Sequence, residues 1–117
     1  MSIGLYAGAK LLSAIFNGAA FRVAGNPYIS LHTSDPGLTG AGEVVGGGYA
    51  RQRAEFTKPE AGAVKNAEII DFPGMPGVIV SHVGVWDAPA GGNYLWGGIM
   101  LEARGVNPLA TFRIASG

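Results

Sequence analysis

The 117-residue chain contains no cysteine, and only 14% of its residues are charged. The lack of cysteine excludes disulfides, metal sites built on thiolates and a cysteine nucleophile. Charged residues make up about 25% of an average soluble domain, so this surface must carry much uncharged or apolar area. The formal net charge is zero, which favours association between molecules. These absences are typical of a subunit that works inside an assembly.

Basic clusters and long apolar runs are lacking as well. The eight basic residues are scattered from Lys10 to Arg113, whereas binding to nucleic-acid phosphates needs clustered positive charge. No apolar run approaches the roughly 20 residues that span a bilayer. The N-terminal apolar residues follow no basic region of the kind that opens a secretion signal. We therefore expect no nucleic-acid or membrane partner, and assembly in the cytoplasm.

Glycine, by contrast, is abundant, with 20 residues beside seven prolines. This is more than twice the usual share of about 7%, and it divides the chain into short extended pieces. A collagen helix would need a strict three-residue period, which is absent. The length predicts one domain over residues 1–117, with a helical segment at 1–18 and a β domain at 28–117.

One helix is predicted over residues 3–16, because apolar residues recur there at the spacing of one helix face. These residues are Leu5, Leu12, Ile15 and Phe16. Ser2 is a suitable N-cap, and Asn17-Gly18 supplies a stop signal. We expect the helix to pack on a sheet face of its own subunit; the alternative is that it grips a neighbouring subunit.

The rest of the chain predicts short strands separated by turns rich in glycine and proline. Residues 28–32 alternate apolar and polar side chains, the period of a half-buried strand. The predicted strands are 28–32, 49–56, 63–72, 78–87, 94–101 and 111–115. With no second helix to make a crossover, they favour an antiparallel β-sandwich or barrel-like domain. The strand at 78–87 has no strongly polar face and is expected to be central.

A long glycine-rich loop is predicted between the first two strands, over residues 33–48. Loops of this length without regular structure are usually functional or disordered. We interpret it as an arm that contacts neighbouring subunits.

Two sets of residues have the composition of a serine hydrolase site. They are Ser30, His32 and Asp35, and Ser81, His82 and Asp87. A triad is defined by its geometry in space, and residues so close along a strand are not expected to converge into nucleophile, base and orienting acid. No G-x-S-x-G motif is present either. The prediction is that the protein is not an enzyme.

Metal and phosphate sites are possible in composition but not in pattern. His32 and His82 with Asp35, Glu43 or Asp87 could hold a divalent ion. However, no histidine pair at i, i+4 and no calcium-loop motif is present. The glycine run at 40–49 lacks the ending and the spacing of phosphate-binding loops. We expect no metal and no cofactor.

Contacts between subunits are the remaining role for polar residues near the loop. Aromatic residues and arginine are enriched at interface hot spots. The predicted interface residues are Tyr49, Arg51, Gln52, Asp35 and Glu43. The alternative is that Tyr49 belongs to the core and Arg51 is a solvated strand residue. Trp86 is expected in the core.

Four segments together resemble small virion proteins of tailed bacteriophages, which are called tail fibre or virion decoration proteins. These segments are LHTSDPG at 31–37, GGYARQ at 47–52, HVGVWD at 82–87 and FRI at 112–114. Each is only moderately specific, but their order and spacing carry the resemblance over about residues 5–117. The resemblance implies a virion structural protein.

Among virion proteins, we expect a capsid decoration or cement protein. A neutral, glycine-rich chain of 12.0 kDa suits a multicopy clamp on a shell. Its partners would be the major capsid protein and further copies of itself, as a homotrimer, since shells offer three-fold positions. One alternative is a minor tail or tail-fibre-associated protein involved in host attachment. An alternative of another class is a glycan-binding adhesin.

Overall fold

The computed structural model describes residues 2–22 and 26–116, which fold into a mainly β structure with one N-terminal helix. The elements are β1 (Ser2–Ile3), α1 (Leu5–Asn17), β2 (Tyr28–His32), β3 (Gln52–Arg53), β4 (Ile70–Phe72), β5 (Val78–Trp86), β6 (Tyr94–Val106) and β7 (Phe112–Ile114). The predicted fold class, mainly β and antiparallel with a single helix at its start, is confirmed.

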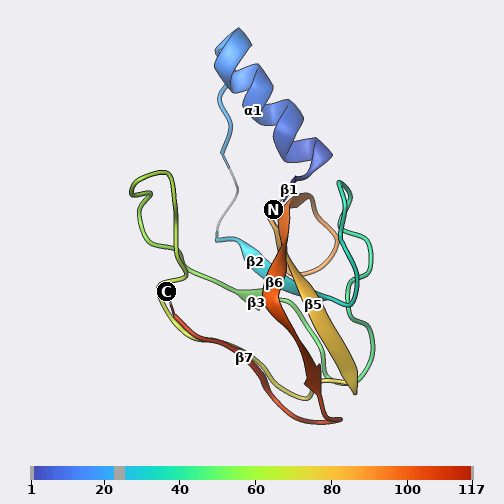
Figure 1. Ribbon diagram of the computed structural model, residues 1–117. Coiled ribbons are helices and arrows are strands. Elements are labelled where there is room, and N and C mark those ends of the chain that lie inside the picture. Colours follow the sequence, from blue (N-terminus) through green and yellow to red (C-terminus); the bar gives the residue numbers. More distant parts are fainter. Residues whose placement is uncertain (1, 23–25, 117) are drawn as a thin grey trace.

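The strands form two antiparallel sheets (Figure 1). The larger has the order β1-β6-β5-β2-β3, and the smaller pairs β4 with β7. Strand β5 lies in the middle of the large sheet, between β6 and β2, as predicted. Strand β2 has the predicted bounds, and all five of its residues pair with β5, from Tyr28 opposite Trp86 to His32 opposite His82.

The core is formed by apolar side chains from both sheets. Phe72 of β4 is fully buried, and its ring lies 6.4 Å from that of Phe112 in β7 and 6.2 Å from that of Tyr49. The buried residues of this cluster are Ile29, Leu31, Val44, Ala54, Ile70, Phe72, Met75, Val80 and Phe112. Burial of such side chains is the main stabilising contribution to a domain of this size.

The helix begins later than predicted, because Ser2 belongs to strand β1 and pairs with Gly97. Gly4 is the N-cap instead, so the prediction for Ser2 is wrong. The pairing of Ser2 and Ile3 with β6 keeps these two residues out of the helix. Gly4 passes so close to Tyr94 that an added Cβ would lie 2.7 Å from the Tyr94 carbonyl oxygen, so glycine is required there. At the other end, Gly18 adopts the left-handed conformation (φ 68°) that ends α1, which confirms the predicted stop.

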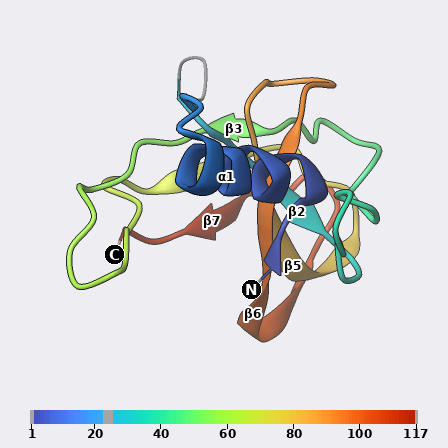
Figure 2. The same ribbon diagram turned by 90° about the horizontal axis from the view of Figure 1, so that it is seen from above.

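The helix projects from the body of the domain (Figures 1 and 2). Ala7 is its one buried residue, whereas Leu12, Ile15 and Phe16 are 58, 71 and 76% exposed. The prediction that the apolar face packs on a sheet of its own subunit is therefore wrong. In the described part of the chain, no helix has the length and apolar character needed to cross a membrane.

Two predicted strands shrink in the structure. The strand predicted at 49–56 is reduced to Gln52–Arg53, and the one at 63–72 to Ile70–Phe72. Between them the chain makes an irregular hairpin with isolated bridges, Phe56 to Asn66 and Glu60 to Ala63. Residues 57–65 are all exposed, so no buried face holds them in a regular strand.

Strand β6, in contrast, is longer than predicted and ends at Val106. Its pairing with β5 jumps from Val80 opposite Arg104 to His82 opposite Ile99. Extra residues of β6 therefore bulge out at this point, and Leu101 is fully exposed there.

The long loop at 33–48 is folded against its own domain. Val44 donates a backbone hydrogen bond to Leu31 (2.9 Å) and is itself a core residue. At Gly40 (φ 84°), a Cβ would lie 2.6 Å from the Trp86 ring, so glycine is needed on both steric and conformational grounds. The loop is thus packed on its own domain, while Leu38 and Val45 are exposed on it, and its contact with neighbouring subunits stays a prediction.

Candidate functional site: the polar network around Arg51

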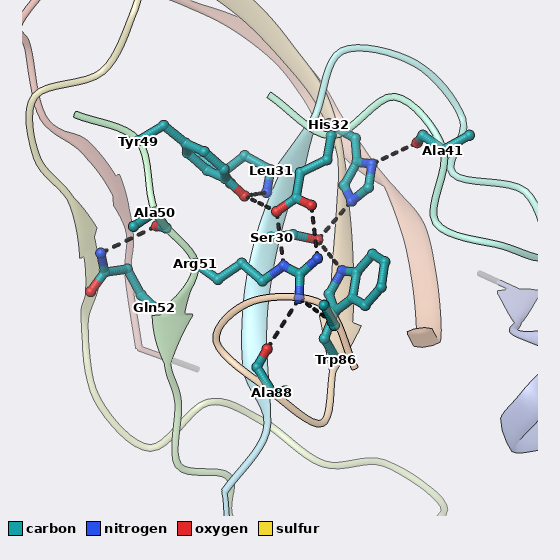
Figure 3. Close-up of polar contacts among 12 residues, drawn as sticks. Ser30, Leu31, His32, Ala41, Tyr49, Ala50, Arg51, Gln52, Trp86 and Ala88 are labelled. Atoms are coloured by element: carbon teal, nitrogen blue, oxygen red, sulfur yellow. Dashed lines mark hydrogen bonds and ion pairs between the residues drawn. The ribbon is translucent and has the colours of Figure 1, made fainter. Parts of the chain in front are cut away.

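The two polar residues of β2 that lie opposite its core face form a buried hydrogen-bonded chain (Figure 3). Because a strand alternates its faces, Ser30 and His32 point to the side away from Ile29 and Leu31. His32 Nδ1 lies 2.8 Å from the Ala41 carbonyl oxygen, which can only accept, so Nδ1 carries a proton.

The second ring nitrogen, Nε2, determines the direction of the remaining hydrogen bonds in this series. Burial lowers the pKa of His32, which favours the neutral ring, so Nε2 is an acceptor. The Ser30 hydroxyl, 2.6 Å away, donates to Nε2. Trp86 Nε1 in turn donates to Ser30 Oγ at 2.9 Å. Each side-chain polar group in the series from His32 through Ser30 to Trp86 is thereby hydrogen-bonded, which offsets the cost of burying it.

Next to this chain, Arg51 is held from three directions. Its Nε and one terminal nitrogen bind both carboxylate oxygens of Glu43, each at 2.9 Å. The other terminal nitrogen donates to the carbonyl oxygens of Ala88 (3.1 Å) and Gly91 (2.9 Å). The guanidinium also lies 3.7 Å from the centre of the Trp86 ring, in cation–π contact. Only 8% of the Arg51 side chain is exposed.

The carboxylate of Glu43 also accepts a hydrogen bond from the Tyr49 hydroxyl at 2.7 Å. Burial alone would raise the pKa of Glu43, but the hydrogen bonds from Arg51 and Tyr49 outweigh it and hold the pKa below its usual value. The Tyr49 oxygen accepts from the Leu31 amide (3.1 Å), and burial raises the pKa of its hydroxyl far above the ordinary range. The network is therefore charged only at the Glu43–Arg51 pair.

The arrangement cross-links segments that are distant along the chain. The groups that it joins come from β2, the loop at 33–48, the segment before β3 and the turn after β5 (Figure 3). Bidentate pairs of this kind add geometric specificity as well as energy. We call this cluster of Ser30, His32, Glu43, Tyr49, Arg51 and Trp86 the Arg51 network.

In the first hydrolase-like set, the structure brings together two of the three residues. Ser30 and His32 do converge, because residues i and i+2 share a strand face. Asp35 does not join them, since its carboxylate accepts from the Gly37 amide at 2.9 Å. Both Ser30 and His32 are fully buried, so this hydroxyl has no access to a substrate.

The second hydrolase-like set is divided between two places. Ser81 Oγ lies 2.8 Å from His82 Nδ1. The Asp87 carboxylate accepts from the backbone amide and the side-chain amide of Asn93, at 2.7 and 2.8 Å, and so closes the turn after β5. Within residues 2–22 and 26–116, no group of three or more histidine, aspartate or glutamate side chains is placed to hold a metal ion.

The structure brings together three of the five predicted interface residues, Glu43, Tyr49 and Arg51. The other two lie apart from them: Asp35 closes its own turn, and Gln52 donates to the Ala50 carbonyl at 3.3 Å. A contact of these five residues with another subunit stays a prediction.

Sequence reasoning missed the part that Ser30 and His32 play in this network. The available signal was their position on a strand between two apolar residues, directly before a glycine-rich loop that could cover them. Trp86, expected in the core, is half-buried and closes the network from β5.

The Arg51 network therefore ties the loop at 33–48 and the turn after β5 of this mainly β domain together through contacts within one chain. The family described as podophage GP4 fiber I protein gp80 matches residues 2–117 of this chain. The chain belongs to this family, and it is a structural protein of a phage virion. The family's structural role argues against an enzyme. No curated protein matches the chain.

Proposed function

We propose that this protein is a subunit of a fibre attached to the tail of a podophage virion. The observation that carries the proposal is the family match, which spans residues 2–117 and names a fibre protein. A match over the whole described domain supports a role for the entire fold, including the projecting helix.

The shape and the internal bonding of the domain support the same role. Its extents are 48 × 26 × 24 Å, so it is elongated, with α1 projecting at one end (Figure 1). The Arg51 network closes the loops onto the sheet with groups from the same chain, so the domain needs no ligand to hold them. A part of a fibre has to keep its shape outside the cell, and such bonding serves that need.

A capsid decoration role is the second candidate, supported by the zero net charge and the high glycine content. A glycan-binding role would need an open aromatic platform. The face of Trp86 is covered by the Arg51 guanidinium at 3.7 Å, which disfavours stacking of a sugar ring there.

Immunogold labelling of intact particles with antibody against this chain tests the proposal. Gold at the tail is the expected result, and gold spread over the head would overturn it in favour of decoration. As a second measurement, particles lacking the protein should adsorb poorly to host cells while releasing their DNA at the normal temperature. Normal adsorption with DNA release at a lower temperature would support decoration instead.

A further inference from the structure

The strands enclose the core except at one seam, between β6 and β7. They follow one another in the order β1-β6-β5-β2-β3, and β3 then contacts β4, which pairs with β7. On the edge away from β5, β6 pairs with β1 at Trp96 and Gly97. Within residues 2–22 and 26–116, no strand pairs with the rest of this edge or with the second edge of β7. The two free edges bound the seam.

The free edge of β7 presents the backbone of Arg113. This residue stands opposite Asp71 in the pairing of β7 with β4, and its carbonyl oxygen accepts from Arg104 Nη2 of β6 at 2.9 Å. The carbonyl therefore faces the seam. In an antiparallel ladder, the N–H and C=O of one residue point to the same side, so the Arg113 N–H faces the seam as well. A side chain thus bridges the two strands where a main-chain partner is missing.

A mainly apolar groove of about 530 Å³ lies along this seam. Val83, Met100 and Ile114 line it and also pack against the core, but each is only half-buried. Two large apolar residues of β6 form its rim: Ile99 is 73% exposed, and Leu101 is fully exposed. The groove therefore uncovers one side of the core, and apolar side chains placed in it would extend the core.

The charges on the groove favour an occupant with a basic residue. Two charged residues, Glu102 and Arg104, line it. The Arg104 guanidinium is engaged by the Arg113 carbonyl and lies 4.4 Å from the centre of the Phe112 ring. Glu102 is exposed and forms no ion pair in the described part of the chain. A positive side chain beside Glu102 would therefore complement the groove.

These features fit an extended segment better than a helix. An added strand hydrogen-bonds to the free N–H and C=O of the edge and sets alternate side chains into a groove beside it. A helix satisfies its own backbone and would leave the edge of β7 unpaired. A second copy of this chain offers no free strand, because each strand that the structure describes is already paired within its own sheets. The occupant is therefore a different chain.

We infer that the seam between β6 and β7 binds an extended segment of another virion protein, which adds a strand to β7. The segment is apolar at alternate positions and carries a basic residue near Glu102. When it binds, the Arg104 side chain releases the Arg113 carbonyl to the backbone of the incoming strand. The seam is thus a place at which this subunit is attached to the particle, whether that place lies on the tail or on the head.

The lack of native cysteine lets a single thiol report on the seam in assembled particles. Leu101→Cys places a thiol on the groove, and the control Val45→Cys places one on the loop at 33–48, where Val45 is 83% exposed. In the purified chain, both should react quickly with a maleimide dye. In particles, Leu101→Cys should react about tenfold more slowly, because a covered thiol is shielded from the reagent, and Val45→Cys should be unchanged.

Three outcomes of the labelling would overturn the inference. One is an equal rate for Leu101→Cys in particles and in the purified chain. Another is an equal slowing of Leu101→Cys and Val45→Cys in particles. The third is slow labelling of Leu101→Cys already in the purified chain, which would assign the groove to a second copy.

Cross-linking identifies the neighbour. A linker with a maleimide and a succinimidyl ester, attached to Leu101→Cys in particles, should join it to lysines within one segment of one other virion protein. Peptide mass spectrometry reads the links, and links to this chain alone would contradict the inference. The site of gold labelling on particles does not bear on this result, so the proposed tail position and the proposed seam fail separately.

Arg113→Pro tests whether the occupant is a strand. Proline removes the N–H that faces the seam and is tolerated on such an edge, whereas the matched control Arg113→Ala keeps this N–H. Both changes lose the ion pair with Asp71. In particles, Arg113→Pro should abolish the protection of Leu101→Cys, and Arg113→Ala should retain it; identical behaviour would refute the added strand. Near-ultraviolet circular dichroism of the two tryptophans checks folding, and the labelling and cross-linking of Leu101→Cys decide the question if Arg113→Pro does not fold.

Discussion

Replacement of Arg51 by lysine tests whether the Arg51 network holds the fold together. Lysine keeps the positive charge, but it loses the bidentate contact with Glu43, most of the bonds to the carbonyl oxygens of Ala88 and Gly91, and the planar contact with Trp86. Hydrogen bonds to charged groups contribute about 1.5–3 kcal/mol each, and removal of one partner from a fully buried pair costs about 3–5 kcal/mol.

Arg51→Lys should lower the free energy of unfolding by about 2–3 kcal/mol, which is less than the cost of removing one partner of a fully buried pair. The loss is smaller because the lysine can re-form one bond to Glu43 and because the Glu43 side chain is 22% exposed. For a domain of this length, this corresponds to a Tm about 6–15 °C lower. Urea unfolding followed by tryptophan fluorescence gives the free energy, and a thermal scan gives the Tm.

The matched control is Arg53→Lys, two residues further along the chain. Arg53 pairs with Glu55 at 3.6 Å, and both side chains are more than 60% exposed, so this change should cost less than about 0.5 kcal/mol. If Arg51→Lys were as stable as Arg53→Lys, the argument that Arg51 locks the loops onto the sheet would be refuted. A double-mutant cycle with Glu43→Gln should give a coupling energy of about 1–3 kcal/mol.

Three further predictions concern other parts of the domain. Burial lowers the folded-state pKa of His32, so the unfolded state binds more protons than the folded state as the pH drops below 6.5. The free energy of unfolding should therefore fall as the pH drops through this range. Urea unfolding at several pH values should show a weaker fall for His32→Gln. Gly84→Ala should lower the free energy of unfolding by about 2 kcal/mol or more, since the added Cβ would lie 2.8 Å from Nε2 of His32. The control Gly105→Ala has open space around the added Cβ and should lower it by less than about 1 kcal/mol. Equal losses in urea unfolding would contradict this prediction. Asp71→Asn should change the Tm by less than about 2 °C, because its 2.7 Å pair with Arg113 is exposed to solvent; a larger drop in a thermal scan would contradict this.

The parts of the fold that the sequence predicted well are those with a clear period and a strong stop signal. The bounds of β2 follow from the alternation of Ile29 and Leu31 with polar residues, and the end of α1 follows from Gly18. The start of α1 could not be predicted from local signals. It is decided by the pairing of Ser2 and Ile3 with β6 and by the close approach of Gly4 to Tyr94, which are contacts between distant residues.

The candidate site was predictable in half of its residues but not in its contacts. Glu43, Tyr49 and Arg51 are among the predicted interface residues, a prediction that rests on the enrichment of arginine and aromatic residues at interface hot spots. Their mutual bonds depend on the fold of the loop at 33–48 over β2, which local propensity does not specify. The exposure of the helix was missed for a related reason: an apolar face predicts burial, but it does not say whether the covering surface belongs to the same chain.

The Arg51 network has a consequence for a chain that has no cysteine. It joins the loop at 33–48 to the turn after β5, a linkage that many extracellular proteins make with a disulfide. A linkage built from a guanidinium and a carboxylate needs no oxidant and no isomerase, so it forms as soon as the chain folds in a reducing cell. It also survives transfer to an oxidising environment, where thiols would be open to wrong pairings. The domain can therefore be finished inside the cell where it is made and still be cross-linked when the particle is released.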